Sequence, residues 1–215
     1  MHSLHYLKTI LGLALLLTLT NCSTSNKLSK RDADFTKAQQ NLILAGDADQ
    51  PMRVFKINNA QDSLLLRKES EEVLPDPKDV TLQRLIQRMY ATVRDSMSLG
   101  VGIAAPQVGI LKKIIWVQRF DKKDFPFEVY LNPKIVQYSK KKQACKEGCL
   151  SIPDRSEMLN SRAYAILIEY DRLDGSHQIE MVEDFTAVVF QHEIDHLDGI
   201  LYLDHFQKEM EAAKP

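Results

Sequence analysis

The chain has 215 residues, of which 44% are hydrophobic, so its length favours one domain with a single buried core over two domains. Lys and Arg number 28 against 29 Asp and Glu, giving a formal net charge of -1, and this balance excludes the basic excess typical of nucleic-acid-binding proteins. Three cysteines are too few for a disulfide framework, so each thiol needs its own explanation.

The N-terminal residues 1–21 have the pattern of a signal peptide. An apolar run over residues 10–19 is shorter than the roughly 20 apolar residues that a membrane-spanning helix needs. The residues that end in Cys22 resemble a bacterial lipobox, although Asn21 stands where a small residue is usual. We therefore expect an exported protein, lipid-anchored in a bacterial cell envelope through Cys22. A cleaved soluble form and a cytoplasmic chain with a misassigned start are the alternatives.

Residues 22–50 are polar and are expected to form a tether, with a short helix around Phe35–Leu44. The folded domain is expected over residues 51–215. Within it, apolar residues recur at helical spacing from Val80 to Met97, and Gly100 is the expected stop.

Short strand-like runs follow this helix, and they are Ile114–Val117, Val129–Leu131, Ile135–Tyr138, Ala165–Tyr170 and Ile179–Val182. The segment Asp171–Gly175 predicts a hairpin turn between the last two runs. A final helix is expected from about Glu183 to Leu197, ending at Gly199. A helix, then several strands, then a helix predict an α+β fold with an antiparallel sheet.

The last helix contains the sequence H-E-x-x-H, with Glu193 between His192 and His196. Residues four apart lie on one face of a helix, so two imidazoles can share one metal ion while the glutamate reaches a metal-bound water. The apolar surroundings predict a buried helix, in which unsatisfied histidines and acids would be costly. The alternative is a chance pair of histidines on an ordinary core helix. Asp195 and Asp198 are interpreted as structural or as supporting the metal ligands, in preference to a direct catalytic role.

A catalytic metal site needs a third protein ligand and an open position for water and substrate. Cys149 is the best candidate, because Gly148 before it lets the backbone approach closely and a tight, partly extended stretch follows. The alternative for a lone cysteine is a small buried core residue. A closed four-ligand structural site that includes Cys145 is a further alternative, but it would leave no water position and no role for Glu193.

Three segments, in order along the chain, resemble motifs of the peptide deformylase family. G-x-G-φ-A-A-x-Q matches Gly100–Gln107, E-G-C-φ-S matches Glu147–Ser151, and H-E-x-D-H matches His192–His196. The similarity covers residues 54–206. It implies an α+β fold with antiparallel sheets packed around a central metal-binding helix. It also implies a metal-dependent amide hydrolase that removes the N-formyl group from N-formylmethionyl peptides and releases formate.

The resemblance further implies that Cys149, His192 and His196 bind one divalent metal ion, which in this family is Fe(II), with zinc, nickel or cobalt able to occupy the same ligands. Glu193 would be the general acid and base. Gln107 and the backbone N–H of Leu150 would stabilise the developing oxyanion. The peptide would bind like an added strand, and the residues expected to contact it are Gly102, Ile103 and Gly148.

The chain departs from the family in two respects. Arg162 resembles an arginine that many members of the family carry directly after a proline, but here Ser161 stands in place of that proline. This difference puts the expected contacts with the peptide in question. Export would separate the enzyme from the ribosome, where new chains are deformylated. A metallopeptidase or amidase acting on another amide in the envelope, and a non-catalytic lipoprotein that binds formyl peptides, are therefore alternatives. Export also predicts that activity requires reduced Cys149, since a Cys145–Cys149 disulfide would destroy the site.

Overall fold

The computed structural model describes residues 34–96 and 100–214, so the expected signal peptide and Cys22 lie outside the described residues. The described residues all belong to one compact unit. Its helices are α1 (Lys37–Leu44), α2 (Ala60–Leu66), α3 (Val80–Arg94), α4 (Asp184–Leu197) and α5 (Tyr202–Ala212), with a 3-10 turn, η1 (Ala105–Val108). Its strands are β1 (Gly102–Ala104), β2 (Ile114–Gln118), β3 (Phe127–Tyr138), β4 (Lys142–Cys149), β5 (Ile152–Ala163), β6 (Ala165–Asp171) and β7 (His177–Glu183). None of the described helices is both long and apolar enough to span a bilayer.

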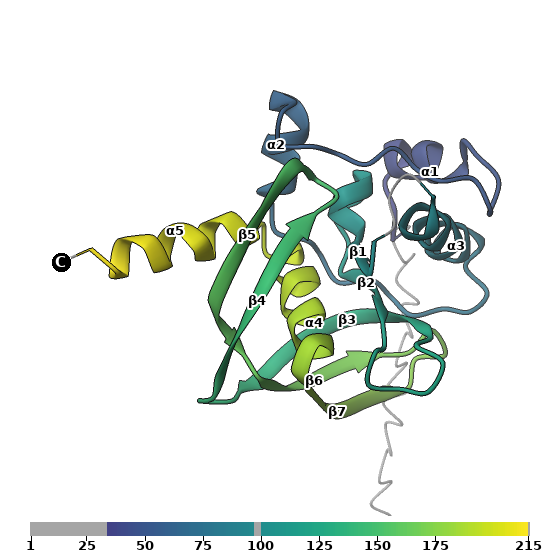
Figure 1. Cartoon of the computed structure of the whole chain (residues 1–215). Coiled ribbons are helices and arrows are strands. Elements are labelled where there is room, and N and C mark those ends of the chain that lie inside the picture. Colours follow the sequence, from purple (N-terminus) through teal and green to yellow (C-terminus); the bar gives the residue numbers. More distant parts are fainter. Residues whose placement is uncertain (1–33, 97–99, 215) are drawn as a thin grey trace, which may run out of the picture. The chain divides into compact units, whose positions relative to one another are not determined.

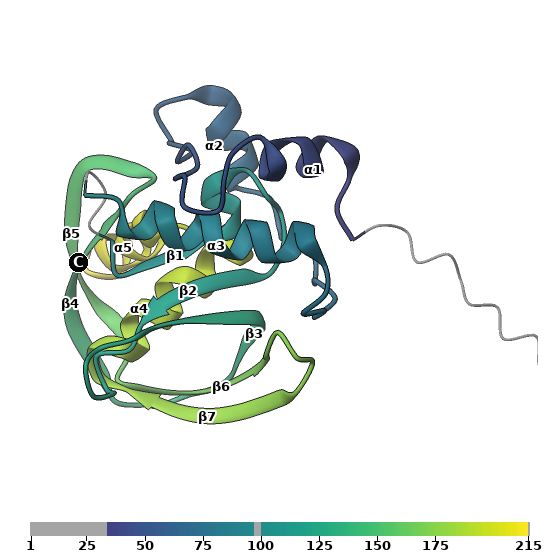
Figure 2. The same ribbon diagram turned by 90° about the vertical axis from the view of Figure 1, so that its right-hand side faces the viewer.

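The expected α+β fold with antiparallel sheets is confirmed. Five strands in the order β1-β2-β3-β6-β7 form the main sheet, while β4 and β5 form a separate two-stranded sheet. Successive strand residues face opposite sides of a sheet, so Ile114 joins the core beneath α3 whereas Ile115 joins the core beneath α4. The apolar core therefore lies in two layers, one on each face of the main sheet, whose strands β2, β3, β6 and β7 follow one another in Figure 2.

Helix α4 lies between the main sheet and the β4–β5 hairpin (Figure 1). Ala187 and Phe190 pack into the core on the sheet side. The Gln191 side chain joins α4 to β5, because it accepts a hydrogen bond from Ala163 N and donates one to Ala163 O, each 2.9 Å long. Enclosure on both sides removes the H-E-x-x-H residues from bulk water, as expected for a central helix.

The short helix expected around Phe35–Leu44 is α1, and it packs on the body of the protein. Phe35 and Ile43 are buried. Arg88, on α3, donates hydrogen bonds of 3.0 Å to the carbonyl oxygens of Leu42 and Ile43 at the end of α1. Residues 34–50, which were assigned to a tether on their polarity, therefore belong to the compact unit.

Several elements differ from the expected ones for local reasons. The expected strands Val129–Leu131 and Ile135–Tyr138 are parts of β3, whose register with β6 shifts at Asn132 (φ 49°) and at Pro133, which has no N–H to donate. The first long helix ends at Arg94, because Asp95 turns to an extended conformation with ψ 133°. The sequence reading did not identify α2, β1, β4, β5 or α5.

Candidate metal centre and active site

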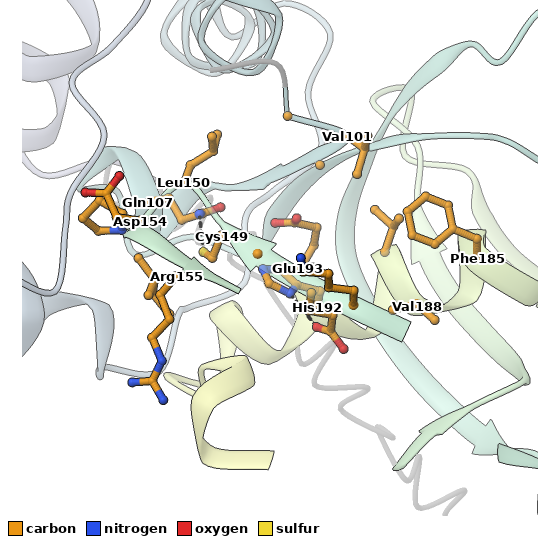
Figure 3. Close-up of a pocket in the computed structure, with 18 residues that line it drawn as sticks. Val101, Gln107, Cys149, Leu150, Asp154, Arg155, Phe185, Val188, His192 and Glu193 are labelled. Atoms are coloured by element: carbon orange, nitrogen blue, oxygen red, sulfur yellow. Dashed lines mark hydrogen bonds and ion pairs between the residues drawn. The ribbon is translucent and has the colours of Figure 1, made fainter. Parts of the chain in front are cut away.

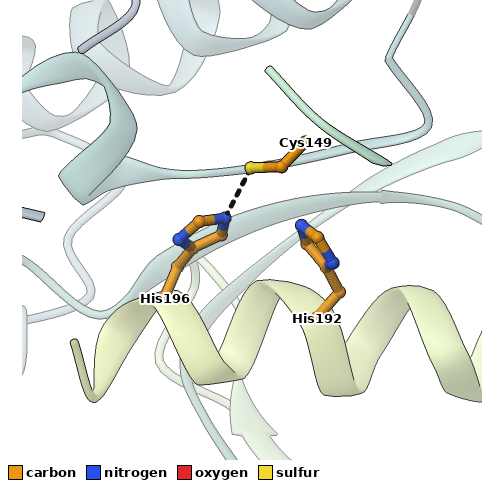
Figure 4. Close-up of side chains that lie close together, drawn as sticks. All are labelled: Cys149, His192 and His196. Carbon is orange, nitrogen blue, oxygen red and sulfur yellow. Dashed lines mark hydrogen bonds between the residues drawn. The ribbon is translucent and has the colours of Figure 1, made fainter. Parts of the chain in front are cut away.

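Helix α4 presents His192 and His196 on one face, one turn apart, with their ring centroids separated by 5.1 Å. Cys149 reaches the same place from the end of β4, where Leu150 and Ser151 connect β4 to β5. Its Sγ lies 3.2 Å from His196 Nε2 (Figure 4). One ligand atom from each of the three side chains lies within 4.8 Å of the others, and no other group of this kind is found in the described ranges.

Two buried charges fix the ring of His192. Its Nδ1 lies 2.8 Å from Glu147 Oε2, and because a carboxylate only accepts, Nδ1 carries the hydrogen and Nε2 is left to bind. Arg162 donates to both oxygens of Glu147, at 2.7 and 2.9 Å. Burial opposes the negative charge of Glu147, but hydrogen bonds with His192 and Arg162 lower its pKa to about 2.

This arrangement gives Glu147 and Arg162 roles that the sequence reading missed. Arg162 is 3% exposed and pairs with Glu147 and with Asp195, so it supports the metal centre from within and does not line the cavity. Ser161, like Arg162, is not among the residues that line the cavity. The register that brings Arg162 onto Glu147 belongs to the β4–β5 hairpin, which the sequence pattern did not reveal.

Glu193 faces the centre with one carboxylate oxygen free. It is 4% exposed, and its Oε2 has no hydrogen-bond partner among the described groups. Burial raises the pKa of Glu193 to about 7. Gly102 on β1 makes room for this carboxylate, because a Cβ at that position would lie 2.5 Å from Glu193 Oε1.

Gln107, on η1, approaches the centre from the other side of Cys149. Its Oε1 accepts a hydrogen bond of 2.8 Å from Ala104 N, and this contact orients the amide. Nε2 consequently points toward the site, 3.4 Å from Cys149 Sγ and 3.2 Å from Ser151 Oγ. The amide is thus a donor held in place before any substrate binds. Leu150, the other expected oxyanion residue, lines the cavity beside Cys149 (Figure 3).

The centre opens into a cavity of about 470 Å³. Figure 3 shows Val101, Phe185 and Val188 on one side of His192 and Glu193, and Asp154 and Arg155 on the other. The cavity therefore has an apolar arm and a charged arm that meet at the metal centre.

Of the residues expected to contact a peptide, Gly102 and Gly148 line the cavity, from β1 and β4. Both strands pair on one side only within the described part of the chain: β1 ends the main sheet, and β4 pairs only with β5. Ile103 differs, because its side chain is fully buried in the core beneath α3, so only its backbone could contact a peptide.

The residues present fit a divalent metal ion. A thiolate and two imidazoles are ligands that such ions accept. Burial holds the pKa of His196 well below its usual range, which keeps this imidazole neutral and able to bind. Its Nδ1 and the Oε2 of Glu193 are buried without a hydrogen-bond partner in the described protein, as expected where the polar environment is completed by a bound group.

Cys145 takes no part in the centre. It lies on β4, four residues before Cys149, so the two are separated along the strand by about 13 Å at a rise of ~3.3 Å per residue. A disulfide needs Cα atoms within about 7 Å. Both thiols are free. A four-ligand site that includes Cys145 and a Cys145–Cys149 disulfide are therefore both incompatible with the folded hairpin.

Comparison with known proteins identifies the family. The family model described as polypeptide deformylase matches residues 54–212. A peptide deformylase of Desulforudis audaxviator is 40% identical over 155 residues, which are 71% of this chain and 94% of that protein. A peptide deformylase of Finegoldia magna is 38% identical over 140 residues, which are 65% of this chain and 82% of that protein.

Solved structures agree with this assignment. The Met-Ala-Ser-bound class I type b peptide deformylase of Acinetobacter baumannii has a TM-score of 0.64 and 31% identity, covering 73% of this chain and 99% of that one. The peptide deformylase of Thermotoga maritima has a TM-score of 0.63 and 30% identity, covering 73% and 97%. Because the family model spans well over half of its residues, this chain belongs to the polypeptide deformylase family.

Proposed function

We propose that this chain hydrolyses the N-formyl group of N-formylmethionyl peptides and releases formate. The family is one of metal-dependent hydrolases. The observation that carries the proposal is the free carboxylate oxygen of Glu193, which is buried beside the Cys149, His192 and His196 ligand group at the junction of a two-armed cavity. Binding of a formyl peptide alone would not require an acid–base group at this place.

Cys149, His192 and His196 would hold one divalent ion. Such an ion, when bound, supplies Lewis-acid catalysis, because it polarises the formyl carbonyl and makes water acidic enough to lose a proton near neutral pH. We propose Fe(II) on the family resemblance, with zinc, nickel or cobalt as alternatives, since one thiolate and two imidazoles suit several divalent ions.

Glu193 would carry the proton through the reaction. Its carboxylate accepts a proton from the water molecule as the water oxygen attacks the formyl carbon. Glu193 then donates that proton to the amide nitrogen as the C–N bond breaks, so formate and a free N-terminal amine leave. A pKa of about 7 lets the same group accept and donate near neutral pH. Gln107 Nε2 and the Leu150 N–H would donate to the formyl oxygen as negative charge builds there.

The cavity supports a peptide substrate whose first side chain is apolar. The Acinetobacter baumannii relative binds Met-Ala-Ser. Here the apolar arm, lined by Val101, Phe185 and Val188, would receive the methionine side chain. The peptide backbone would lie along the free edges of β1 and β4, near Gly102 and Gly148, in the manner of an added strand.

The proposal is tested by measuring formate release from formyl-Met-Ala-Ser. The chain lacking its first 25 residues is purified without oxygen and loaded with Fe(II) or Ni(II), beside a Glu193→Ala variant. We expect metal-dependent release that the substitution abolishes. Acetyl-Met-Ala-Ser serves as the matched substrate. Cleavage of the acetyl peptide at a similar rate would indicate an amidase of broader range, and no release from the folded, loaded protein would refute deformylase activity.

For location, we propose that residues 1–21 are a signal peptide, that Cys22 carries the lipid anchor and that the enzyme acts in the bacterial cell envelope. The apolar run over residues 10–19 and its position before Cys22 support this. Since α1 packs on the body of the protein, the tether would be confined to residues before 34. Radiolabelled palmitate should enter the wild-type chain and not a Cys22→Ser variant. An unlabelled wild-type chain in the cytoplasmic fraction would contradict the proposal.

A further inference from the structure

A continuous network of hydrogen bonds leads from His192 to the outer helix α5. Glu147 and Arg162 form its inner part, as described above. From there Arg162 Nη1 donates a bond of 2.6 Å to Asp195 Oδ2. The same oxygen lies 2.9 Å from Nε2 of His205 on α5. Since a carboxylate only accepts, Nε2 of His205 is the donor.

Because the side chains of this network are largely buried, the loss of any one of its hydrogen bonds is costly. The side chains of Glu147 and Arg162 are both 4% exposed, that of Asp195 is 17% exposed, and that of His205 is 25% exposed. One guanidinium cation thus serves two carboxylates in a region that is mostly closed to water. A buried carboxylate that loses a donor either rotates toward another donor or draws in water. His205, on the side of Asp195 that faces solvent, is the second donor to its carboxylate, beside Arg162.

Contacts with the rest of the protein fix the first turn of α5, and they keep His205 in position beside Asp195. Tyr202 is 1% exposed, and its hydroxyl donates to Arg155 O at 3.0 Å. Asp204 forms a two-pronged ion pair with Arg67 and accepts a hydrogen bond of 2.8 Å from Leu201 N. Further along α5, Glu209 accepts hydrogen bonds of 2.9 Å from Asn160 N and 2.8 Å from Ser161 N on β5, and the helix then ends at the C-terminal edge of the protein (Figure 1). The anchored turn therefore places one imidazole against Asp195.

We propose that His205 is a positioning residue for the metal centre, one that acts through Asp195. By donating to Asp195, it holds Arg162 where that side chain keeps Glu147 on Nδ1 of His192. The ring of His192 then stays oriented toward Cys149 and His196. His205 touches neither ligand nor substrate. The inference rests on the proposed function only in that the three side chains bind a metal ion.

Metal retention tests this inference without any substrate. The full chain, purified in mild detergent, is loaded with Co(II), whose visible spectrum reports bonding to a thiolate. Excess EDTA is then added, and the decay of the spectrum gives the rate of Co(II) loss. His205→Phe removes the donor and keeps an aromatic ring, whereas His205→Gln keeps an N–H near the position of Nε2.

The chain offers a matched control far from the ligands. His177 on β7 also pairs with a carboxylate, with Nδ1 2.9 Å from Asp171 Oδ1, so His177→Phe removes a comparable histidine–aspartate contact. We expect His205→Phe to lose Co(II) about tenfold faster than wild type, at the lower end of the 10–100-fold effect known for residues that orient metal ligands. We expect His205→Gln and His177→Phe to lose it at the wild-type rate.

The other possible outcomes of this experiment each contradict a specific part of the proposal. Equal rates for His205→Phe and wild type would overturn the role of His205 while leaving the metal centre intact. Equal acceleration in His177→Phe would show a general loss of stability and would also overturn it. A wild-type chain that binds no Co(II) would overturn the metal centre and this inference together. A chain that retains Co(II) as expected but releases no formate would refute the proposed activity alone.

Discussion

The side-chain amide of Gln107 has two separable roles. Oε1 holds the local backbone by accepting from Ala104 N, and Nε2 faces the metal centre. Gln107→Glu keeps the acceptor and removes the donor, so it isolates the second role. We expect this substitution to lower kcat on the order of 10²–10³-fold, as loss of one oxyanion donor does, with a much smaller change in KM.

Gln107→Ala is the companion variant, since it removes both contacts. It should lower kcat similarly and also lower the melting temperature. Steady-state formate release and thermal unfolding separate the two effects. A wild-type kcat in Gln107→Glu would remove Gln107 from oxyanion stabilisation.

Cys145 and Cys149 are expected to respond independently to oxidation. The strand β4 keeps the two thiols too far apart to join. Hydrogen peroxide should therefore inactivate wild type and Cys145→Ser at the same rate, through oxidation of the Cys149 thiolate alone. Activity assays with mass spectrometry of the intact chain measure both the rate and the product. Protection by Cys145→Ser, or a mass loss of two hydrogens in the wild type, would contradict the folded hairpin as described.

Short-range spacing made most of the centre predictable from the sequence. His192, Glu193 and His196 lie within one turn of a helix, so their grouping needs only helical periodicity. To predict Cys149 as the third ligand, it was necessary to compare the cysteines with one another and to use the family motif. Glu147, Arg162, Asp195 and His205 could not be connected in this way, because their contacts depend on the register of β4 with β5 and on the docking of α5.

At the scale of elements, a helix or strand could be predicted from the sequence where its burial leaves a recognisable pattern of apolar residues. Helix α3 and strand β6 carry apolar residues in a clear period because one face of each packs on a core layer, whereas α4 is apolar on nearly all sides because it is enclosed. The β4–β5 hairpin has no regular alternation of buried and exposed residues, and its buried positions include the paired charges Glu147 and Arg162, so no apolar period marks it. In α5 only Tyr202 is buried, and the short apolar stripe of Leu203, Phe206 and Met210 stands in an otherwise polar sequence, where it was not recognised.

Helix α1 provides a test of whether the N-terminal segment is structural. Ile43 is fully buried against the core, while its neighbour Leu44 is 48% exposed. Ile43→Ala should lower the free energy of unfolding by roughly 2–5 kcal/mol, because it leaves a cavity in the core. Leu44→Ala should change it by no more than about 0.5 kcal/mol. Urea unfolding followed by circular dichroism measures both. Equal, small effects would indicate that α1 is a detachable part of the tether.

Across the whole molecule, a second ion-pair cluster, built around one buried cation, joins the main sheet to the loop after β2. Arg119 is 2% exposed, and its guanidinium contacts Asp121 at 2.6 Å and Glu180 on β7 at 2.7 Å. It also donates a hydrogen bond of 2.7 Å to the hydroxyl of Tyr130 on β3. Loop and strands that are distant in sequence are therefore held by one cation, and the stability of this region should depend on the charge of its carboxylates.

The dependence on pH follows from the direction of the pKa shifts. The hydrogen bond from Arg119 holds the pKa of Asp121 below its usual value. A carboxyl group whose pKa is lower in the folded chain than in the unfolded chain contributes stability above its unfolded pKa, near about 4, and this contribution disappears as the pH falls through the folded value. Asp121→Asn removes the contribution at every pH. The variant should therefore unfold at lower urea than wild type at pH 7, and the difference should shrink as the pH falls below about 4.

Asp124→Asn is the matched control, because Asp124 is exposed in the same loop and its positive φ of 63° is one that asparagine tolerates. Its difference from wild type at pH 7 should be small, because Asp124 makes no contact with Arg119 among the described ion pairs. A difference for Asp121→Asn that stays constant from pH 7 to pH 3 would show that Asp121 acts through shape or hydrogen bonding and not through its charge. In that case Glu128, 3.3 Å from the Arg119 guanidinium, and Glu180 would be the carboxylates that balance its charge.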